Sequence, residues 1–157
     1  MTTVDRVRYS RHLALPQVGA EGQRRLEQSS VLVIGLGGLG SVASLYLANA
    51  GIGHLVINDF DRVDATNLPR QILFRESDVG EYKTHATAER LRAANPAPHV
   101  NVLNRRLDAD ELRDAVSACG LILDFTDNLP TRVALNAACV RARKPLVTGA
   151  AIRFEGQ

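Results

Sequence analysis

Residues 30–40 of the chain read SVLVIGLGGLG. The first half, Ser30–Ile34, is a β-branched apolar run that predicts a buried strand. The second half is a glycine-rich turn in which Gly35, Gly37 and Gly40 fit the pattern G-x-G-x-x-G. In that pattern the first glycine permits a tight turn, the second lets a phosphate approach the backbone, and the third lets the next helix pack on the strand. The stretch therefore predicts a strand, a nucleotide-binding turn and a helix, with an ordinary turn as the alternative.

Strands and helices alternate over the rest of the chain. Helices are expected from the glycine turn to Ala50, where Gly51 suits a helix C-terminus, and over residues 80–95, 109–118 and 128–143. Further strands are expected over residues 54–58, 100–103, 121–125, 146–148 and 151–154. Two short helical segments, residues 4–15 and 20–28, come first. The pattern predicts an α/β fold: a Rossmann-like, doubly wound, mostly parallel sheet over residues 30–157, after an N-terminal helical extension over residues 1–29.

Length and composition restrict the class of protein. The chain has 157 residues, about one domain, and 45% of them are hydrophobic and 23% charged, as in globular proteins. The net charge of +2 is dispersed, so nothing favours nucleic acid, and no secretory or membrane segment is recognisable. Cys119 and Cys139 are too few for a disulfide scaffold or a zinc site, and we assign them no role. We expect a cytoplasmic protein with reduced thiols, and we interpret the end at Gln157, directly after a strand, as that of a fragment.

A carboxylate follows the second predicted strand. Asp59 lies about 20 residues after the glycine turn, where a carboxylate accepts hydrogen bonds from ribose hydroxyls in dinucleotide-binding folds. Asp61 and Asp64 are competitors for this role, and one of them can simply be a turn residue. The glycine turn and Asp59 together indicate an adenosine ligand, either NAD or ATP.

Two further positions favour a polyphosphate. Lys83 lies in the first turn of a predicted helix, where a cation is unfavourable unless an anion lies beside it. The alternative is a solvated surface lysine. Asp127 follows the fourth strand, where a carboxylate can hold Mg²⁺ beside phosphate oxygens. Its alternative role is to cap the next helix, unless Asn128 fills that position. We expect both Lys83 and Asp127 to be partly exposed.

These segments together resemble the ThiF/MoeB/HesA family, bacterial relatives of ubiquitin-activating E1 enzymes. The resemblance runs from about Arg8 to the last residue, and it rests on RYSR at residues 8–11, the glycine turn, NL at 67–68, RQ at 70–71, DVG at 78–80 with Lys83, DFTDN at 124–128 and residues 149–157. It implies ATP-dependent adenylation of the C-terminal glycine of a ubiquitin-like sulfur carrier similar to MoaD or ThiS. Pyrophosphate is released, and the products serve molybdopterin, thiamine or related sulfur-transfer biosynthesis.

The resemblance also implies roles for individual residues. The expected ligands of ATP are Gly35, Gly37, Gly38, Gly40, Asp59, Asn67, Arg70, Gln71, Lys83, Asp127 and Asn128. Asp127 would hold Mg²⁺, and the expected catalytic residues are Arg11, Arg70, Lys83 and Asp127. Arg11 would act in the partner's site across a homodimer, although its spacing from Arg8 is also typical of a solvated helix face.

The sequence departs from the family at two positions and ends before the family does. Thr66 and Pro69 stand where the family usually has Ser and Gln, and Pro69 lacks a backbone donor. Family members continue past this end point into a part that binds structural zinc in many of them, and those ligands are not in this chain.

Two other functions compete with adenylation. An NAD-dependent oxidoreductase would use the glycine turn and Asp59 but would leave Arg70, Lys83 and Asp127 without a role. A nucleotide-binding scaffold would bind ATP without catalysis. Adenylation fits the residues best, because a carboxylate that is already ionised needs cations and positioning more than it needs a general base.

Overall fold

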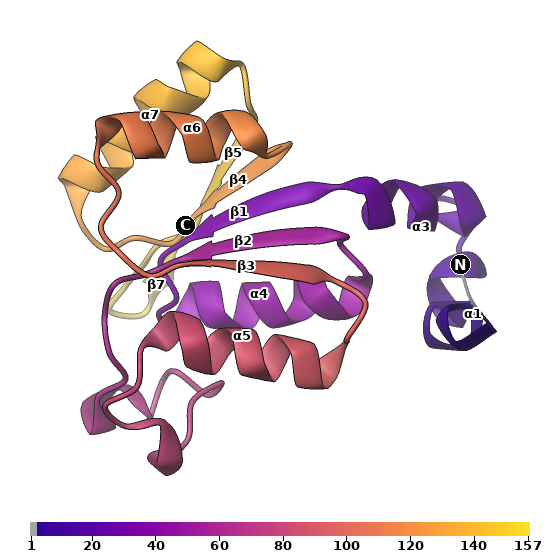
Figure 1. Ribbon diagram of the computed structural model, residues 1–157, viewed down its shortest axis with the longest axis horizontal. Coiled ribbons are helices and arrows are strands. Elements are labelled where there is room, and N and C mark those ends of the chain that lie inside the picture. The colour runs from indigo at the N-terminus through magenta and orange to yellow at the C-terminus, as the bar shows by residue number, and fades with distance from the viewer. Residues whose placement is uncertain (1–2) are drawn as a thin grey trace.

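A five-stranded parallel sheet forms the centre of the molecule (Figure 1). The computed structural model describes residues 3–157, so residues 1 and 2 of the expected N-terminal extension lie outside the described residues. The strands, in spatial order, are β3 (His99–Leu103), β2 (His54–Asn58), β1 (Ser30–Ile34), β4 (Leu121–Asp124) and β5 (Leu146–Thr148). The predicted Rossmann-like α/β fold is confirmed.

Helices cover both faces of this sheet. In Figure 1, α4 (Gly38–Ala50) and α5 (Lys83–Ala94) lie on one face, and α6 (Ala109–Ala118) and α7 (Leu129–Ala142) lie on the other. The chain runs outward from β1 to β2 and β3, and then crosses to β4 and β5 on the other side of β1. The direction of winding therefore reverses between β1 and β4. Ligands of doubly wound sheets bind beyond the carboxyl ends of the strands at such a point.

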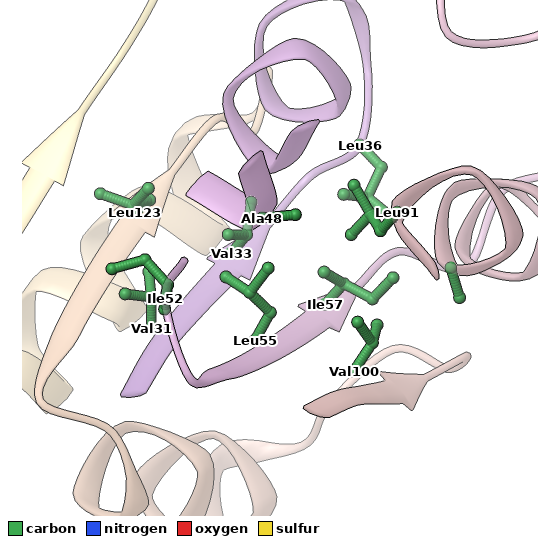
Figure 2. Close-up of a cluster of buried hydrophobic side chains, with 11 residues drawn as sticks. Val31, Val33, Leu36, Ala48, Ile52, Leu55, Ile57, Leu91, Val100 and Leu123 are labelled. Atoms are coloured by element: carbon green, nitrogen blue, oxygen red, sulfur yellow. The ribbon is translucent and has the colours of Figure 1, made fainter. Parts of the chain in front are cut away.

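Two apolar clusters hold the layers together, one on each face of the sheet. Successive side chains of a strand point to opposite faces, so Val31 and Val33 of β1 enter one cluster while Leu32 and Ile34 enter the other. Figure 2 shows the first cluster, in which β1 and β2 pack against Leu91 of α5. Burial on both faces is the reason that β1 reads as a continuous apolar run.

The N-terminal segment is more broken than the sequence predicts. The expected helix over residues 4–15 is divided into α1 (Thr3–Arg8) and α2 (Ser10–Leu13), and α3 (Gly19–Gln28) follows. The chain turns at Tyr9, whose ring is buried and whose hydroxyl accepts a hydrogen bond from Asn95 Nδ2 at 2.8 Å. Gln23 Nε2 donates to Ala50 O at 3.0 Å. These contacts hold the three helices near the amino ends of the strands, at the right of Figure 1.

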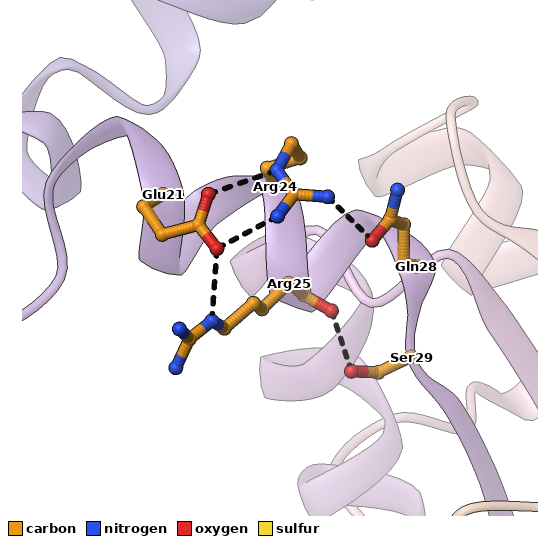
Figure 3. Close-up of polar contacts among 5 residues, drawn as sticks. All are labelled: Glu21, Arg24, Arg25, Gln28 and Ser29. Atoms are coloured by element: carbon orange, nitrogen blue, oxygen red, sulfur yellow. Dashed lines mark hydrogen bonds and ion pairs between the residues drawn. The ribbon is translucent and has the colours of Figure 1, made fainter.

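Two adjacent arginines on α3, Arg24 and Arg25, lie beside an acid on the same helix. Glu21 accepts hydrogen bonds from Arg24 at 2.7 and 2.9 Å and from Arg25 at 3.1 Å (Figure 3). These bonds lower the pKa of the Glu21 carboxyl below its usual value, and the bonds from Arg24 contribute most to this effect. The pair of arginines is therefore part of a solvent-exposed helix surface with a local counter-charge.

Two predicted elements differ in the structure. Residues 151–154 do not add a sixth strand to the sheet, because β6 (Ala151–Ile152) pairs antiparallel with β7 (Glu155–Gly156) in a separate hairpin. The helix expected from residue 80 begins at Lys83, because Gly80 has a φ of 92° and ends a turn. Two short 3₁₀ helices, η1 (Ala65–Asn67) and η2 (Glu76–Asp78), fill the connection from β2 to α5. Within residues 3–157, no helix has the length and apolarity of a membrane span.

Candidate nucleotide site

Three loops begin side by side at the carboxyl edge of the sheet. Ile34 of β1 lies opposite Asn58 of β2 and opposite Asp124 of β4. The residues that follow these three are Gly35, Asp59 and Phe125. Gly35 N donates to Asn58 O and Phe125 N donates to Ile34 O, both at 2.9 Å. The glycine turn, Asp59 and the segment that contains Asp127 therefore start from one edge, at the point where the winding reverses.

The glycines of the turn serve different purposes. Gly35 has a φ of 87°, and a Cβ on it would lie 2.8 Å from Phe125 O; a Cβ on Gly40 would lie 1.8 Å from Gly35 O. These two glycines allow backbone segments to approach one another. At Gly37 the nearest atom to an added Cβ is Gln71 Nε2 at 3.9 Å, so the backbone there borders open space. Among residues 3–157, no side chain caps the N-terminus of α4, which leaves its first amides available to an anion.

Asp59 contacts the glycine turn directly. Its Oδ2 accepts from Leu36 N and its Oδ1 accepts from Asp61 N, each at 2.8 Å. Each carboxylate oxygen keeps acceptor capacity for a further donor, as a ribose hydroxyl would supply. Asp64 has a different role: it accepts from Thr66 Oγ1 and Thr66 N, and these bonds lower its pKa below the usual value. Of the competing carboxylates, Asp64 is thus the turn residue.

Residues 66–71 fold as a compact turn against the glycine turn. A Cβ on Gly38 would lie 3.0 Å from Arg70 O, which places the two segments in contact. Arg70 is exposed, whereas Gln71 is buried, and Gln71 Oε1 has no hydrogen-bond partner among the described residues. Arg70 N and Gln71 N both donate to Asn67 O. The turn needs no N–H from residue 69, so Pro69 is accommodated.

Lys83 is buried and paired, which corrects the expectation that it is partly exposed. Its Nζ donates to Asp61 Oδ2 at 3.0 Å, and its backbone N donates to Asp61 O, also at 3.0 Å. Next to this pair, the Arg62 guanidinium lies over the Tyr82 ring, 3.8 Å from its centroid. The connection after β2 thus covers the start of α5 and removes Lys83 from solvent. The alternative of a solvated surface lysine is wrong.

The loop after β4 leaves Asp127 exposed. Asn128 caps α7, because its Oδ1 accepts from Thr131 N at 3.0 Å. This settles the choice of capping residue and releases Asp127 from that role. Asp124, which ends β4, is buried; its Oδ1 accepts from Thr126 N, whereas its Oδ2 has no partner among the described residues.

One residue that shapes this loop, Arg132, was not predicted from the sequence. Arg132 Nε donates to Thr126 O at 2.9 Å, and Arg132 Nη2 donates to Gly149 O at 3.0 Å. The side chain therefore joins the loop after β4 to the segment after β5. The sequence did contain an indication of this role. Arg132, like Lys83, is a cation in the first turn of a helix, where a nearby anion or carbonyl must offset the helix dipole.

Arg11 lies away from the other predicted site residues of the same chain. It belongs to α2, where the neighbouring His12 Nδ1 is 2.9 Å from Gln23 Oε1. Gln23 in turn reaches Ala50, just before β2 begins. This is the amino edge of the sheet, opposite the glycine turn. The structure does not bring Arg11 to the nucleotide site within one chain.

The cysteines do not offer a nucleophile. Both Cys119 and Cys139 are buried, and burial raises the pKa of each thiol above its usual value. For Cys139 the negative charge of Asp124 adds to this effect. In the described part of the chain, no group of three or more His, Cys, Asp or Glu side chains is arranged to hold a metal ion. Mg²⁺ needs no such group, because proteins commonly hold it through one or two carboxylates and the phosphates of a nucleotide.

A protein-family model matches nearly the whole chain. The model of the ThiF family matches residues 9–157. The sulfur carrier protein ThiS adenylyltransferase of Escherichia coli K12 is 46% identical over 157 residues, which are 100% of this chain and 62% of that protein. The molybdopterin-synthase adenylyltransferase of Salmonella typhimurium LT2 is 44% identical over 151 residues, or 96% of this chain and 61% of that protein. The chain thus spans less than two thirds of these relatives.

Solved structures agree with this relationship. E. coli tRNA N6-threonylcarbamoyladenosine dehydratase, TcdA, in complex with ATP superposes with a TM-score of 0.88 at 32% identity, over 97% of this chain and 64% of that one. E. coli MccB with ATP superposes with a TM-score of 0.82 at 31% identity, over 93% of this chain and 46% of that one.

Proposed function

Because this chain belongs to the ThiF family, we propose that it forms the nucleotide-binding part of an enzyme that adenylates a ubiquitin-like sulfur carrier similar to ThiS or MoaD. The observation that carries the proposal is the meeting of the glycine turn, Asp59 and the Lys83–Asp61 pair at one edge of the sheet. Two relatives are named as adenylyltransferases of a sulfur carrier or of molybdopterin synthase, which supports this substrate class. The product would serve thiamine, molybdopterin or a related sulfur-transfer pathway in the cytoplasm.

The residues fit an adenosine polyphosphate. The open backbone at Gly37 and the uncapped start of α4 suit a phosphate. The carboxylate of Asp59 suits the ribose hydroxyls. Further phosphate ligands would come from residues with amide, guanidinium or ammonium donors: Asn67, Arg70, Gln71 and Lys83. Mg²⁺ would offset the charge of the phosphates, and Asp127 would hold it.

The chemistry explains the kind of residues present. The C-terminal carboxylate of the carrier is ionised at neutral pH, since its pKa is roughly 3.5. One of its oxygens attacks the α-phosphorus of ATP, the bond to the bridging oxygen breaks, and pyrophosphate leaves with the electron pair. The barrier is the approach of an anion to a polyanion, so Arg70, Lys83 and the α4 N-terminus would contribute by positioning and charge. No thiol nucleophile is needed, in agreement with the raised pKa of both cysteines.

Asp127→Asn should weaken ATP binding in Mg²⁺ about tenfold, or about 1.4 kcal/mol, and should leave binding in EDTA unchanged. The substitution removes the negative charge that would hold the metal while keeping the size of an exposed side chain. Calorimetric titration of the chain with ATP measures both affinities. Asp114→Asn, which removes an exposed acid from α6, is the matched control and should have no effect. An equal loss in EDTA would contradict a metal-holding role.

Arg11 should act in trans. Its place at the amino edge of the sheet means that it can serve a nucleotide site only in a second copy of the chain, so we propose a homodimer. Arg11→Ala and Lys83→Met subunits should each be inactive in ATP–pyrophosphate exchange. Mixing them should restore about a quarter of the normal rate, because half of the dimers are mixed and each has one complete site. Failure to recover activity on mixing would refute the role in trans. The control is Arg6→Ala, at an exposed residue of α1, which should stay active without mixing.

A further inference from the structure

We propose that Asp61 is a positioning residue for Lys83, and that its carboxylate holds the ammonium at the edge of the nucleotide site, where it meets the phosphates of ATP. The inference rests on the proposed function, which gives Asp61 no role of its own.

Asp61 fixes Lys83 at both ends. Its carboxylate accepts from Lys83 Nζ at 3.0 Å, and its carbonyl accepts from Lys83 N, also at 3.0 Å. The two side chains differ in exposure: that of Lys83 is 8% exposed and that of Asp61 is 56% exposed. The lysine is thus the buried member of the pair, and the aspartate connects it to the solvent-facing site.

The same residue ties Lys83 to the glycine turn. Asp61 N donates to Asp59 Oδ1, and Asp59 Oδ2 accepts from Leu36 N, each at 2.8 Å. A continuous series of hydrogen bonds therefore runs from Leu36 through Asp59 and Asp61 to Lys83. It sets the position of the ammonium relative to the backbone that would face the phosphates. The backbone bridge between Arg62 and Tyr82 holds the next pair of residues together.

A carboxylate is the group that this position requires. A buried ammonium without a counter-charge is strongly unfavourable, and the positive end of the α5 dipole adds to the repulsion. Asp61 offsets both. An ammonium has three N–H donors, and the bond to Asp61 uses one of them, so others remain for phosphate oxygens. Because Asp61 is largely hydrated, it can share the ammonium with an incoming anion at little cost.

A double-mutant cycle with Asp61→Asn and Lys83→Met tests the proposal in two ways. Without nucleotide, Asp61→Asn should lower Tm more than Lys83→Met does, because it leaves the buried charge unpaired. In the Lys83→Met background, Asp61→Asn should lower Tm no further. With ATP and Mg²⁺, Asp61→Asn should raise Kd about tenfold when Lys83 is present and less than twofold when residue 83 is methionine.

Glu81→Gln, the control, removes an exposed carboxylate two residues before Lys83. It should change neither Tm nor the Kd of ATP. An equal rise in Kd in both backgrounds would mean that Asp61 touches the nucleotide itself, and would refute positioning. A lowered Tm with unchanged Kd would make the pair merely structural and would also refute it. Absence of ATP binding by the unsubstituted chain would instead overturn the proposed function, and this inference with it.

Discussion

Gly40→Ala should lower the free energy of unfolding by about 3 kcal/mol or more, although alanine normally stabilises a helix relative to glycine by roughly 0.5–1 kcal/mol. Gly40 lies in the first turn of α4, and a Cβ on it would lie 1.8 Å from Gly35 O. Gly35 cannot move away from the added Cβ, because it lies against the backbone of Phe125. The substitution therefore separates α4 from β1. Thermal denaturation should show Tm lower by roughly 10 °C.

Gly22→Ala is the matched control for this prediction. Gly22 is also helical, in α3, but an added Cβ would meet only the side chain of Val18, with Cγ1 at 3.0 Å. A side chain can move where a backbone carbonyl cannot. Gly22→Ala should change stability by less than about 1 kcal/mol. If Gly40→Ala behaved like Gly22→Ala, the close packing of α4 on the glycine turn would be wrong.

Lys83→Met should reduce ATP–pyrophosphate exchange by about 100-fold or more, the range found when one group that stabilises transition-state charge is removed. Methionine fills the buried volume of the lysine stem without its charge, and it leaves behind an aspartate that is 56% exposed and can be hydrated. Stability should therefore change little. The rate is measured by exchange of labelled pyrophosphate into ATP, with a ThiS-like or MoaD-like carrier as the proposed substrate.

The chain offers a natural control for the charge. Lys144 is its second and last lysine, and it follows α7, near the start of β5. Lys144→Met changes the net charge by the same amount and should leave exchange within about twofold. If Lys83→Met left exchange within the same range, Lys83 would have no part in the reaction.

The sequence predicted the main sheet well, because its strands are short apolar runs between glycines and helices. Residues 30–34, 54–58 and 146–148 are strands in the structure as predicted. The strand at 151–154 was misplaced, because an apolar segment does not state which partner it pairs with. The break at Tyr9 depends on Asn95, which is 86 residues away, and no local pattern contains that contact.

The candidate site could also be predicted only in part from the sequence. The position of Asp59 beside the glycine turn followed from the order of strand, turn and strand. The burial of Lys83 did not, because it depends on a pairing with Asp61 across 22 residues. The choice between Asp127 and Asn128 as capping residue also needed geometry, since both side chains can cap a helix.

The most direct test of the account is the melting temperature of this chain with ATP and Mg²⁺, compared with NAD. A ligand at about 100 times its Kd adds about 2.7 kcal/mol of stability, which raises Tm of a domain of this size by several degrees. We expect this rise with ATP and Mg²⁺, its loss or marked reduction in Lys83→Met, and no rise with NAD. A rise of Tm with NAD alone, or no rise with either nucleotide, would contradict the assignment of an ATP site.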